Sequence, residues 1–415
     1  MTMTLKDRRG YNISGASPAD GDAFEHILEL HLSWQCGVEA DLQKLIAEAP
    51  RFTMAHVLEA YLGLCSRDVA RVQRARFAVA RAGELPANHR ESLHVAAIRA
   101  ALDDDFAAFR SCLQGLLVQY PRDLLALQVT HAIDYLTGDI EAMHAHIAAV
   151  LPNWSVAVPG FHAVLAMQAF SLVEATHYEE ARDRGLHALS LMPRDARALH
   201  ALVHVCEMKG DPFGGDRLMF ERRIFWADSV AATHCWWHWA LFHLAEGAVT
   251  DALNIYDMRL RQPRSTELAD LIDSSALLWR LALLEVDTGS RWNELADAWV
   301  SRIDDGYCTF NDMHAMVAFV GAEDWQSAAR LEAGLLRGRM QGTRYGETTR
   351  LVGLPVCRAI LAFGKGHYAR ATELLSTVPT MARRMGGSQA QRDLLYLTLM
   401  EAIHRLRRPA GRVAA

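Results

Sequence analysis

The sequence lacks the features of a membrane-spanning or nucleic-acid-binding protein. Its 415 residues include no run of about 18 uncharged apolar residues, so no transmembrane helix is expected. Residues 1–21 are polar and contain no apolar segment of the kind that directs secretion. Lysine and arginine, 43 together, are outnumbered by 49 aspartate and glutamate residues, which argues against a nucleic-acid partner.

Cysteine pairs and catalytic motifs are also absent. The seven cysteines never form a Cys-x-x-Cys pair, so we expect reduced thiols in a cytoplasmic protein. The sequence has no Gly-x-Ser-x-Gly, no phosphate-binding Gly-rich loop and no His-Glu-x-x-His motif. No cofactor is therefore predicted from motifs.

A helical period runs through most of the chain. Apolar residues recur three and four positions apart in segments such as 124–136, 164–173 and 277–286, whereas alternating strand patterns are scarce. Short turns that contain glycine, as at Gly138 and Gly210, interrupt the periodic segments. We predict an all-α protein of roughly twenty helices joined by short turns.

Two segments share the pattern of the second helix of a tetratricopeptide repeat. Ala181 and Pro193 have the same twelve-residue separation as Phe109 and Pro121, and the two prolines lie 72 residues apart, which is about two repeat lengths. We therefore predict an α-solenoid of degenerate helical hairpins, stacked into a curved superhelix with a concave groove. The expected organisation is an irregular extension over residues 1–20, a single repeat domain over 21–408 and a flexible tail over 409–415.

Two helix starts are marked by capping residues. Ser17 stands directly before Pro18, which is typical of a capped start with proline in the first turn. Ser388 and Gln391 have the spacing of a capping box, directly after a Gly-Gly pair.

The densest group of functional side chains carries four histidines. A helix turns about 100° per residue, so His200, His204 and Glu207 share one stripe, and His234 and His238 share another. If the glycine that follows each segment closes the first helix of its repeat, the first stripe and His234 face the concave groove. The repeat offset then places His234 on the groove helix next to the one that carries His200.

Three interpretations of this group stay open. Imidazoles four residues apart and a nearby carboxylate can bind a divalent metal, with His200, His204 and Glu207 as the candidate ligands. The same side chains suit hydrogen bonding to a ligand, with one histidine as a general base. They also suit a polar cluster that satisfies itself between helices. We predict a ligand-binding groove lined by His200, His204, Glu207, His234, Trp237, His238, Asn311 and His314.

Other polar and aromatic side chains have structural interpretations. Asp273 and Arg280 lie seven positions apart in an apolar helix, which predicts a buried ion pair that fixes the stacking of the repeats. Asn311 or Asp312 is expected to cap the start of a helix. Successive helical residues diverge, so the core is expected to take at least two of Trp236, Trp237 and Trp239.

Several short motifs, each uninformative alone, form an ordered set. They are Arg90–Val95, Pro121–Leu127, His204–Lys209, Trp237–Leu241, Ile255–Asp257, Phe310–His314, Gly353–Cys357 and Gly386–Asp393. In this set the chain resembles the tetratricopeptide repeat protein 38 family. The resemblance implies an α-solenoid of degenerate repeats, and it implies no activity.

These observations lead to a binding hypothesis. We expect a solenoid that holds a small polar molecule or a peptide segment in a groove lined by His, Trp and Asp, or a scaffold that uses its outer surface. The alternative is an enzyme, with or without a metal, whose active site lies in the same groove around His200, His204, Glu207, His234 and His238. The sequence leaves self-association into a homo-oligomer open.

Overall fold

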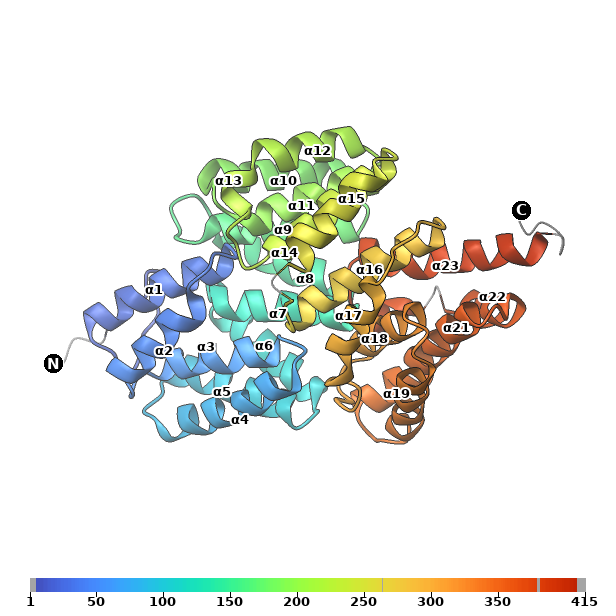
Figure 1. Cartoon of the computed structure of the whole chain (residues 1–415). Coiled ribbons are helices and arrows are strands. Elements are labelled where there is room, and N and C mark those ends of the chain that lie inside the picture. Colours follow the sequence, from blue (N-terminus) through green and yellow to red (C-terminus); the bar gives the residue numbers. More distant parts are fainter. Residues whose placement is uncertain (1–4, 263, 379–380, 409–415) are drawn as a thin grey trace. The chain divides into compact units, whose positions relative to one another are not determined.

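The computed structural model describes residues 5–262, 264–378 and 381–408, which form helices and turns almost throughout (Figure 1). Within these ranges β pairing is limited to two isolated bridges, Lys6 with Asn12 and Gln35 with Ser229. The all-α prediction is therefore confirmed. Contacts between residues divide the chain into two compact units. The first unit comprises the described residues up to Tyr135 and Asp139–Cys235, and the second comprises Leu136–Gly138 and the described residues from Trp236 onward.

The helices of the first unit follow one another as antiparallel hairpins. In chain order they are α1 (Pro18–Leu32), α2 (Val38–Glu48), α3 (Thr53–Leu64), α4 (Val69–Glu84), α5 (His89–Leu102), α6 (Phe106–Gln119), α7 (Leu124–Thr137), α8 (Ile140–Val150), α9 (Phe161–Glu174), α10 (Tyr178–Leu191), α11 (Ala196–Met208), α12 (Pro212–Glu221) and α13 (Arg223–Trp226). The next helix, α14 (Ala232–Ala245), is continuous across the division between the units.

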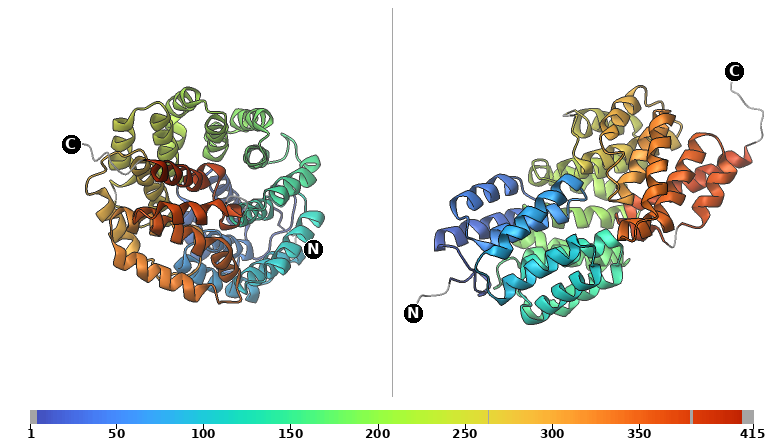
Figure 2. Two further views of the ribbon diagram at one scale, coloured as in Figure 1. Left: turned by 90° about the vertical axis from the view of Figure 1, so that its right-hand side faces the viewer. Right: turned by 90° about the horizontal axis from the view of Figure 1, so that it is seen from below.

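Helices pack within and between hairpins in the same way along the first unit. Partners within a hairpin are α3 with α4, α5 with α6, and α9 with α10. In Figure 2 the helices coloured blue to green, which belong to this unit, lie side by side in chain order. The first helix of one hairpin also contacts the first helix of the next, as α3 contacts α5 and α9 contacts α11. This is the packing of a helical-repeat array, in which each hairpin buries its apolar face on its neighbours.

The second unit repeats the pattern with more irregular helices. Its elements are α15 (Val249–Ile255), a π-helix (Tyr256–Leu260), α16 (Leu268–Leu283), α17 (Arg291–Val300), α18 (Thr309–Gly321), α19 (Trp325–Gly338), α20 (Arg344–Thr348), a second π-helix (Thr349–Gly353), α21 (Leu354–Gly364), α22 (Tyr368–Ser376) and α23 (Gln389–Arg407). The first helices α16, α18 and α21 contact one another in sequence, and α21 and α22 form a hairpin (Figure 1).

The hairpin turns share one backbone conformation. In each turn a residue with positive φ ends the first helix of the hairpin, and this residue is not always glycine. In the described chain these residues are Trp34, Arg67, Asp104, Gly138, Thr176, Gly210, Gly247, Glu285, Glu323 and Gly366. The turn geometry therefore recurs at about one repeat length even where the glycine signal is missing from the sequence.

Both predicted capped starts are present. Ser17 accepts a hydrogen bond from the Asp20 amide in a capping box that opens α1, and Ser388 and Gln391 form the box that opens α23. Residues 5–17 contain no helix, and the predicted tail over 409–415 lies outside the described residues. Among the described helices, none is both long enough and apolar enough to cross a bilayer.

Candidate functional site

A buried aspartate positions each of two first helices in the first unit. Asp195 caps α11 by accepting a hydrogen bond from the Ala198 amide at 3.0 Å, and its other oxygen lies 2.7 Å from Nδ1 of His162, 33 residues earlier. Asp123 caps α7 in the same way and lies 2.6 Å from Nη1 of Arg90, also 33 residues earlier. Each aspartate thus joins the start of one repeat to the preceding repeat. Asp195 caps the start of α11, and Asp123 caps the start of α7.

The histidines of α11 and α14 converge. Nε2 of His200 lies 3.0 Å from Nε2 of His204 and 3.0 Å from Nε2 of His234. His238 lies one turn after His234 in the same continuous helix, so the helix itself sets its place beside His234. One ring nitrogen from each of the four residues lies within 4.8 Å of the others. We call these four side chains the histidine cluster.

The short distances within the histidine cluster bring three ring nitrogens close together. An imidazole Nε2 has one in-plane direction in which it donates or accepts a hydrogen bond. Nε2 of His200 has two other Nε2 atoms at 3.0 Å, so it cannot make a well-directed bond to both.

Aromatic rings hold the imidazoles of α11 in place. Phe170 stacks on His200 at 5.7 Å between ring centroids and meets His204 edge to face at 5.4 Å. The indole of Trp34 lies 5.0 Å from the His200 ring. His204 and His238 are fully buried and His200 is nearly so, whereas His234 is only partly buried. Three of the four imidazoles are thus shielded from solvent, and His234 is the most exposed member of the cluster.

Two other predicted groove residues have different surroundings. Glu207 lies in the last turn of α11, is half-buried, and is not one of the residues whose ligand atoms converge. Trp237 is fully buried, with the guanidinium of Arg280 over its ring at 5.4 Å. Trp237 and Trp239 are both in the core, so the prediction that at least two of the three indoles fill the core is confirmed.

Asn311, Asp312 and His314 lie inside α18 in the second unit. The expectation that Asn311 or Asp312 caps this helix is wrong, because the helix already begins at Thr309 and its cap residue is Cys308. Phe310 is fully buried, and packing of this side chain explains why the helix starts early. His314 is also fully buried, with Nδ1 2.8 Å from the carbonyl oxygen of Phe310.

Asp273 and Arg280 are both buried on α16, as expected for structural residues. The Arg280 guanidinium donates hydrogen bonds to the Ala390 carbonyl at 2.7 Å and to the Ala276 carbonyl at 3.2 Å. The first of these bonds connects α16 to the start of α23. The ion pair between Asp273 and Arg280 stays a prediction.

Asp312 provides a pH-dependent prediction for stability. Burial raises the pKa of Asp312 to about 7, partly offset by the hydrogen bond that the Tyr345 hydroxyl donates at 3.0 Å. Because this pKa is above the ordinary 3.8, the folded chain binds the proton more tightly than the unfolded chain does. The protonated carboxyl therefore stabilises the fold. This contribution to the free energy of unfolding is complete below about pH 4 and is lost as pH rises through 7. Asp312→Asn keeps an acceptor for Tyr345 and cannot ionise. Its free energy of unfolding should exceed that of the parent by about 4 kcal/mol at pH 8, and by less at pH 5. Denaturant unfolding at both pH values measures the difference, and an equal difference at both would contradict the assignment.

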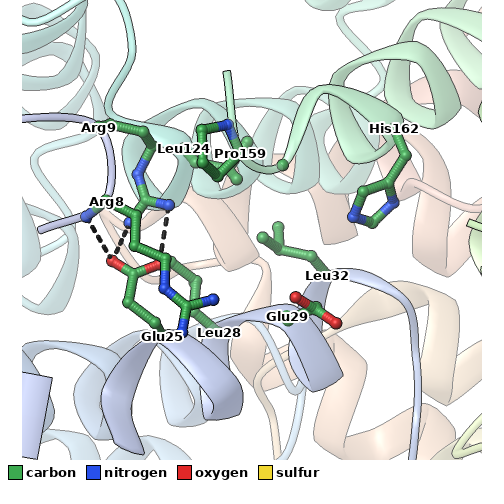
Figure 3. Close-up of a pocket in the computed structure, with 10 residues that line it drawn as sticks. Arg8, Arg9, Glu25, Leu28, Glu29, Leu32, Leu124, Pro159 and His162 are labelled. Atoms are coloured by element: carbon green, nitrogen blue, oxygen red, sulfur yellow. Dashed lines mark hydrogen bonds and ion pairs between the residues drawn. The ribbon is translucent and has the colours of Figure 1, made fainter. Parts of the chain in front are cut away.

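A small pocket in the first unit is lined by several polar and charged residues, and some of them are already paired (Figure 3). Arg9 donates to both oxygens of Glu25, and His162 on the far side is bonded to Asp195. Leu28, Leu32 and Leu124 supply apolar walls. This pairing anchors the N-terminal segment on α1, and the pocket is a weaker site candidate than the histidine cluster.

No protein-family model matches the chain. Among solved structures, the chain is similar to the crystal structure of the P58(IPK) TPR domain, over 95% of this chain and 100% of that chain. The sequence identity is 11% and the TM-score is 0.22, so this similarity carries no argument about the site.

Sequence reasoning did not assign roles to Asp123, Asp195, Arg197 or Trp34. The signal available for the aspartates is the 33-residue spacing to a basic side chain in the preceding repeat, as in Arg90 to Asp123 and His162 to Asp195. Trp34 gives no such signal, because its contacts are with residues more than 160 positions away.

Proposed function

We propose that this chain is a helical-repeat binding protein whose histidine cluster holds a divalent transition metal. The observation that carries the proposal is the convergence of three Nε2 atoms on α11 and α14, two of them 3.0 Å from the third. Zinc–nitrogen bonds of 2.0–2.1 Å in a tetrahedral site place ligand nitrogens about 3.4 Å apart. The distances of the cluster lie around that value, so small side-chain movements are enough to admit the ion.

The donor set favours particular metals. Neutral imidazoles suit zinc, copper and nickel, whereas calcium and magnesium require oxygen ligands, and the convergent group contains only histidine. Burial of His204 and His238 and the aromatic rings around His200 limit the approach of water. Four protein ligands complete a tetrahedral sphere, whereas catalytic zinc keeps one position for water or substrate. We therefore propose binding, rather than catalysis, as the role of the cluster.

The general role, the family and the location of the protein are also part of this proposal. The repeat fold supports a binding or scaffold role in general, and the histidine cluster supplies its specific ligand. Membership of the tetratricopeptide repeat protein 38 family and a cytoplasmic location belong to this proposal and rest on the ordered sequence motifs and on the unpaired pattern of cysteines.

Metal titration of the purified full-length chain tests the proposal. After dialysis against a chelator, the chain should bind one Zn²⁺ or Co²⁺ per molecule, and Co²⁺ should give the visible spectrum of a four-nitrogen tetrahedral site. His200→Ala removes the central ligand and should weaken binding at least about 100-fold, more than loss of a residue that only supports a ligand. His26→Ala, at an exposed position on α1, is the matched control and should bind as the parent does. Equal binding by parent and His200→Ala, or no binding by the parent, would reject the metal site.

A further inference from the structure

Arg197 in the first unit differs from Arg90 and Arg261, two other buried arginines, in having no anionic partner among the described residues. Nη1 of Arg90 lies 2.6 Å from an Asp123 oxygen, and Arg261 lies 2.6 Å from Glu294. Arg197 is only 7% exposed, yet within the described chain its guanidinium makes no hydrogen bond or ion pair, and its Nε is fully enclosed without a partner. A buried charge normally persists only where an opposite charge or hydrogen bonds compensate it.

The nearest carboxylate is already engaged. Asp195 stands two residues before Arg197, but its oxygens accept the Ala198 amide and lie against His162. Burial lowers the pKa of Arg197 to about 10, and the attraction of Asp195 offsets this only in part. The guanidinium is therefore charged at neutral pH and needs a further anion.

The imidazoles near Arg197 add no second positive charge. Burial, reinforced by the Arg197 cation, lowers the pKa of His31 to about 4 and that of His131 to about 3. Both imidazoles are neutral at pH 7. Gln128 is hydrogen-bonded to His31, and His131 lies 3.2 Å from the Met167 carbonyl oxygen. Apart from Asp195, which is engaged with His162 and the Ala198 amide, the site thus offers one positive charge among neutral polar groups.

The turn between α1 and α2 places an aromatic wall over Arg197. The Ala196 amide donates to the Ser33 carbonyl at 3.1 Å, and the Gln35 side chain donates to the Arg194 carbonyl at 2.7 Å. Between these two bonds Trp34 has φ 58°, a left-handed conformation that is rare for an aromatic residue. Its indole lies 5.1 Å from the guanidinium carbon of Arg197.

This stacking orients the guanidinium. An indole that covers one face of the ion leaves the nitrogens at its edge for in-plane hydrogen bonds. Nε is fully enclosed without a partner, whereas the terminal nitrogens are not fully enclosed.

We propose that Arg197 anchors a binding site for the carboxylate group of a small molecule, with Trp34 as one wall. The planar guanidinium fork matches a carboxylate in a bidentate pair. A monoanion neutralises the single unpaired charge, whereas a phosphate dianion brings a second negative charge that no described group near Arg197 balances. The site lies wholly within the first unit, and the inference does not rest on a metal at the histidine cluster.

Carboxylate binding to the chelator-treated full-length chain tests this inference. Calorimetric titration with benzoate and with acetate should show saturable binding to the parent, and inorganic phosphate at the same concentration should bind more weakly. Arg197→Met keeps the length of the side chain and removes the charge, so binding should be lost. Arg197→Lys keeps the charge without the fork and should bind about tenfold more weakly, the loss expected for part of a charged hydrogen-bond pair.

Thermal stability without ligand gives an independent readout. Arg197→Met removes an uncompensated charge and should melt at or above the temperature of the parent. Arg90→Met, the matched control, strands Asp123 and should melt well below it. Preferential phosphate binding, absence of carboxylate binding to the parent, or undiminished binding by the Arg197→Met or Arg197→Lys variants would each overturn the proposal. If Arg197→Met fails to fold, the charge is structural and the proposal is wrong.

Discussion

Replacement of Asp123 by alanine is expected to lower the free energy of unfolding by about 3–5 kcal/mol. Oδ2 of this buried carboxylate lies 2.6 Å from Nη1 of Arg90 and 3.0 Å from Nε2 of His94, and Oδ1 caps α7 through the Ala126 amide at 2.9 Å. Alanine leaves the buried Arg90 charge without its close partner, since Asp7 is 3.6 Å away, and it also removes the cap. Denaturant unfolding measures the loss.

The pH dependence of stability supplies a second readout for Asp123. Burial alone would raise the pKa of this carboxyl, but the charges of His94 and Arg90 and the hydrogen bonds hold it well below 3.8. Its contribution to stability is therefore present above about pH 4 and is lost as pH falls toward the folded-state pKa. Asp123→Ala should be less sensitive to acid than the parent. Asp183→Ala, at an exposed position on α10, should change the free energy of unfolding by less than about 0.5 kcal/mol. A similarly small change for Asp123→Ala would show that the pair does not stabilise the fold.

Zinc is expected to stabilise the folded chain through the histidine cluster. A ligand that binds only the folded state at 100 times its Kd adds about 2.7 kcal/mol to the free energy of unfolding. In His204→Ala this zinc-dependent increase should disappear, because His204 supplies a fully buried nitrogen 3.0 Å from the central His200. Thermal unfolding of each protein with zinc and with chelator checks the prediction.

The comparison is made within each variant, so the cost of truncating a buried side chain cancels. His26→Ala should retain the full zinc-dependent increase. An increase of the same size in His204→Ala would place the zinc elsewhere, for example on the partly accessible cysteines.

Local sequence spacing was enough to predict much of the fold and the meeting of the histidines. The helical period defines α7, α11 and α16, and proline and glycine mark several hairpin ends. Because i and i+4 share a helix face and successive first helices stack, the spacing of His200, His204 and His234 predicted that their rings would meet. The structure places the Nε2 atoms of His204 and His234 at 3.0 Å from that of His200. Their role as a binding site stays a prediction.

Features that depend on packing between distant segments were not predictable in this way. Trp34 reaches Arg197 only because the turn after α1 is hydrogen-bonded to the start of α11. The lack of an anionic partner for Arg197 depends on which residues pack around it in the folded chain, and no sequence pattern predicts it. The cap of α18 was placed wrongly because burial of Phe310 sets where that helix begins, and capping preference does not.

X-ray absorption spectroscopy at the zinc edge, on the zinc-loaded full-length chain, tests the central claim most directly. The account predicts four nitrogen ligands at about 2.0 Å, with the outer-shell scattering of imidazole rings, and no sulfur ligand. A spectrum with sulfur at about 2.3 Å, or with oxygen ligands and no imidazole scattering, would contradict metal binding by His200, His204, His234 and His238.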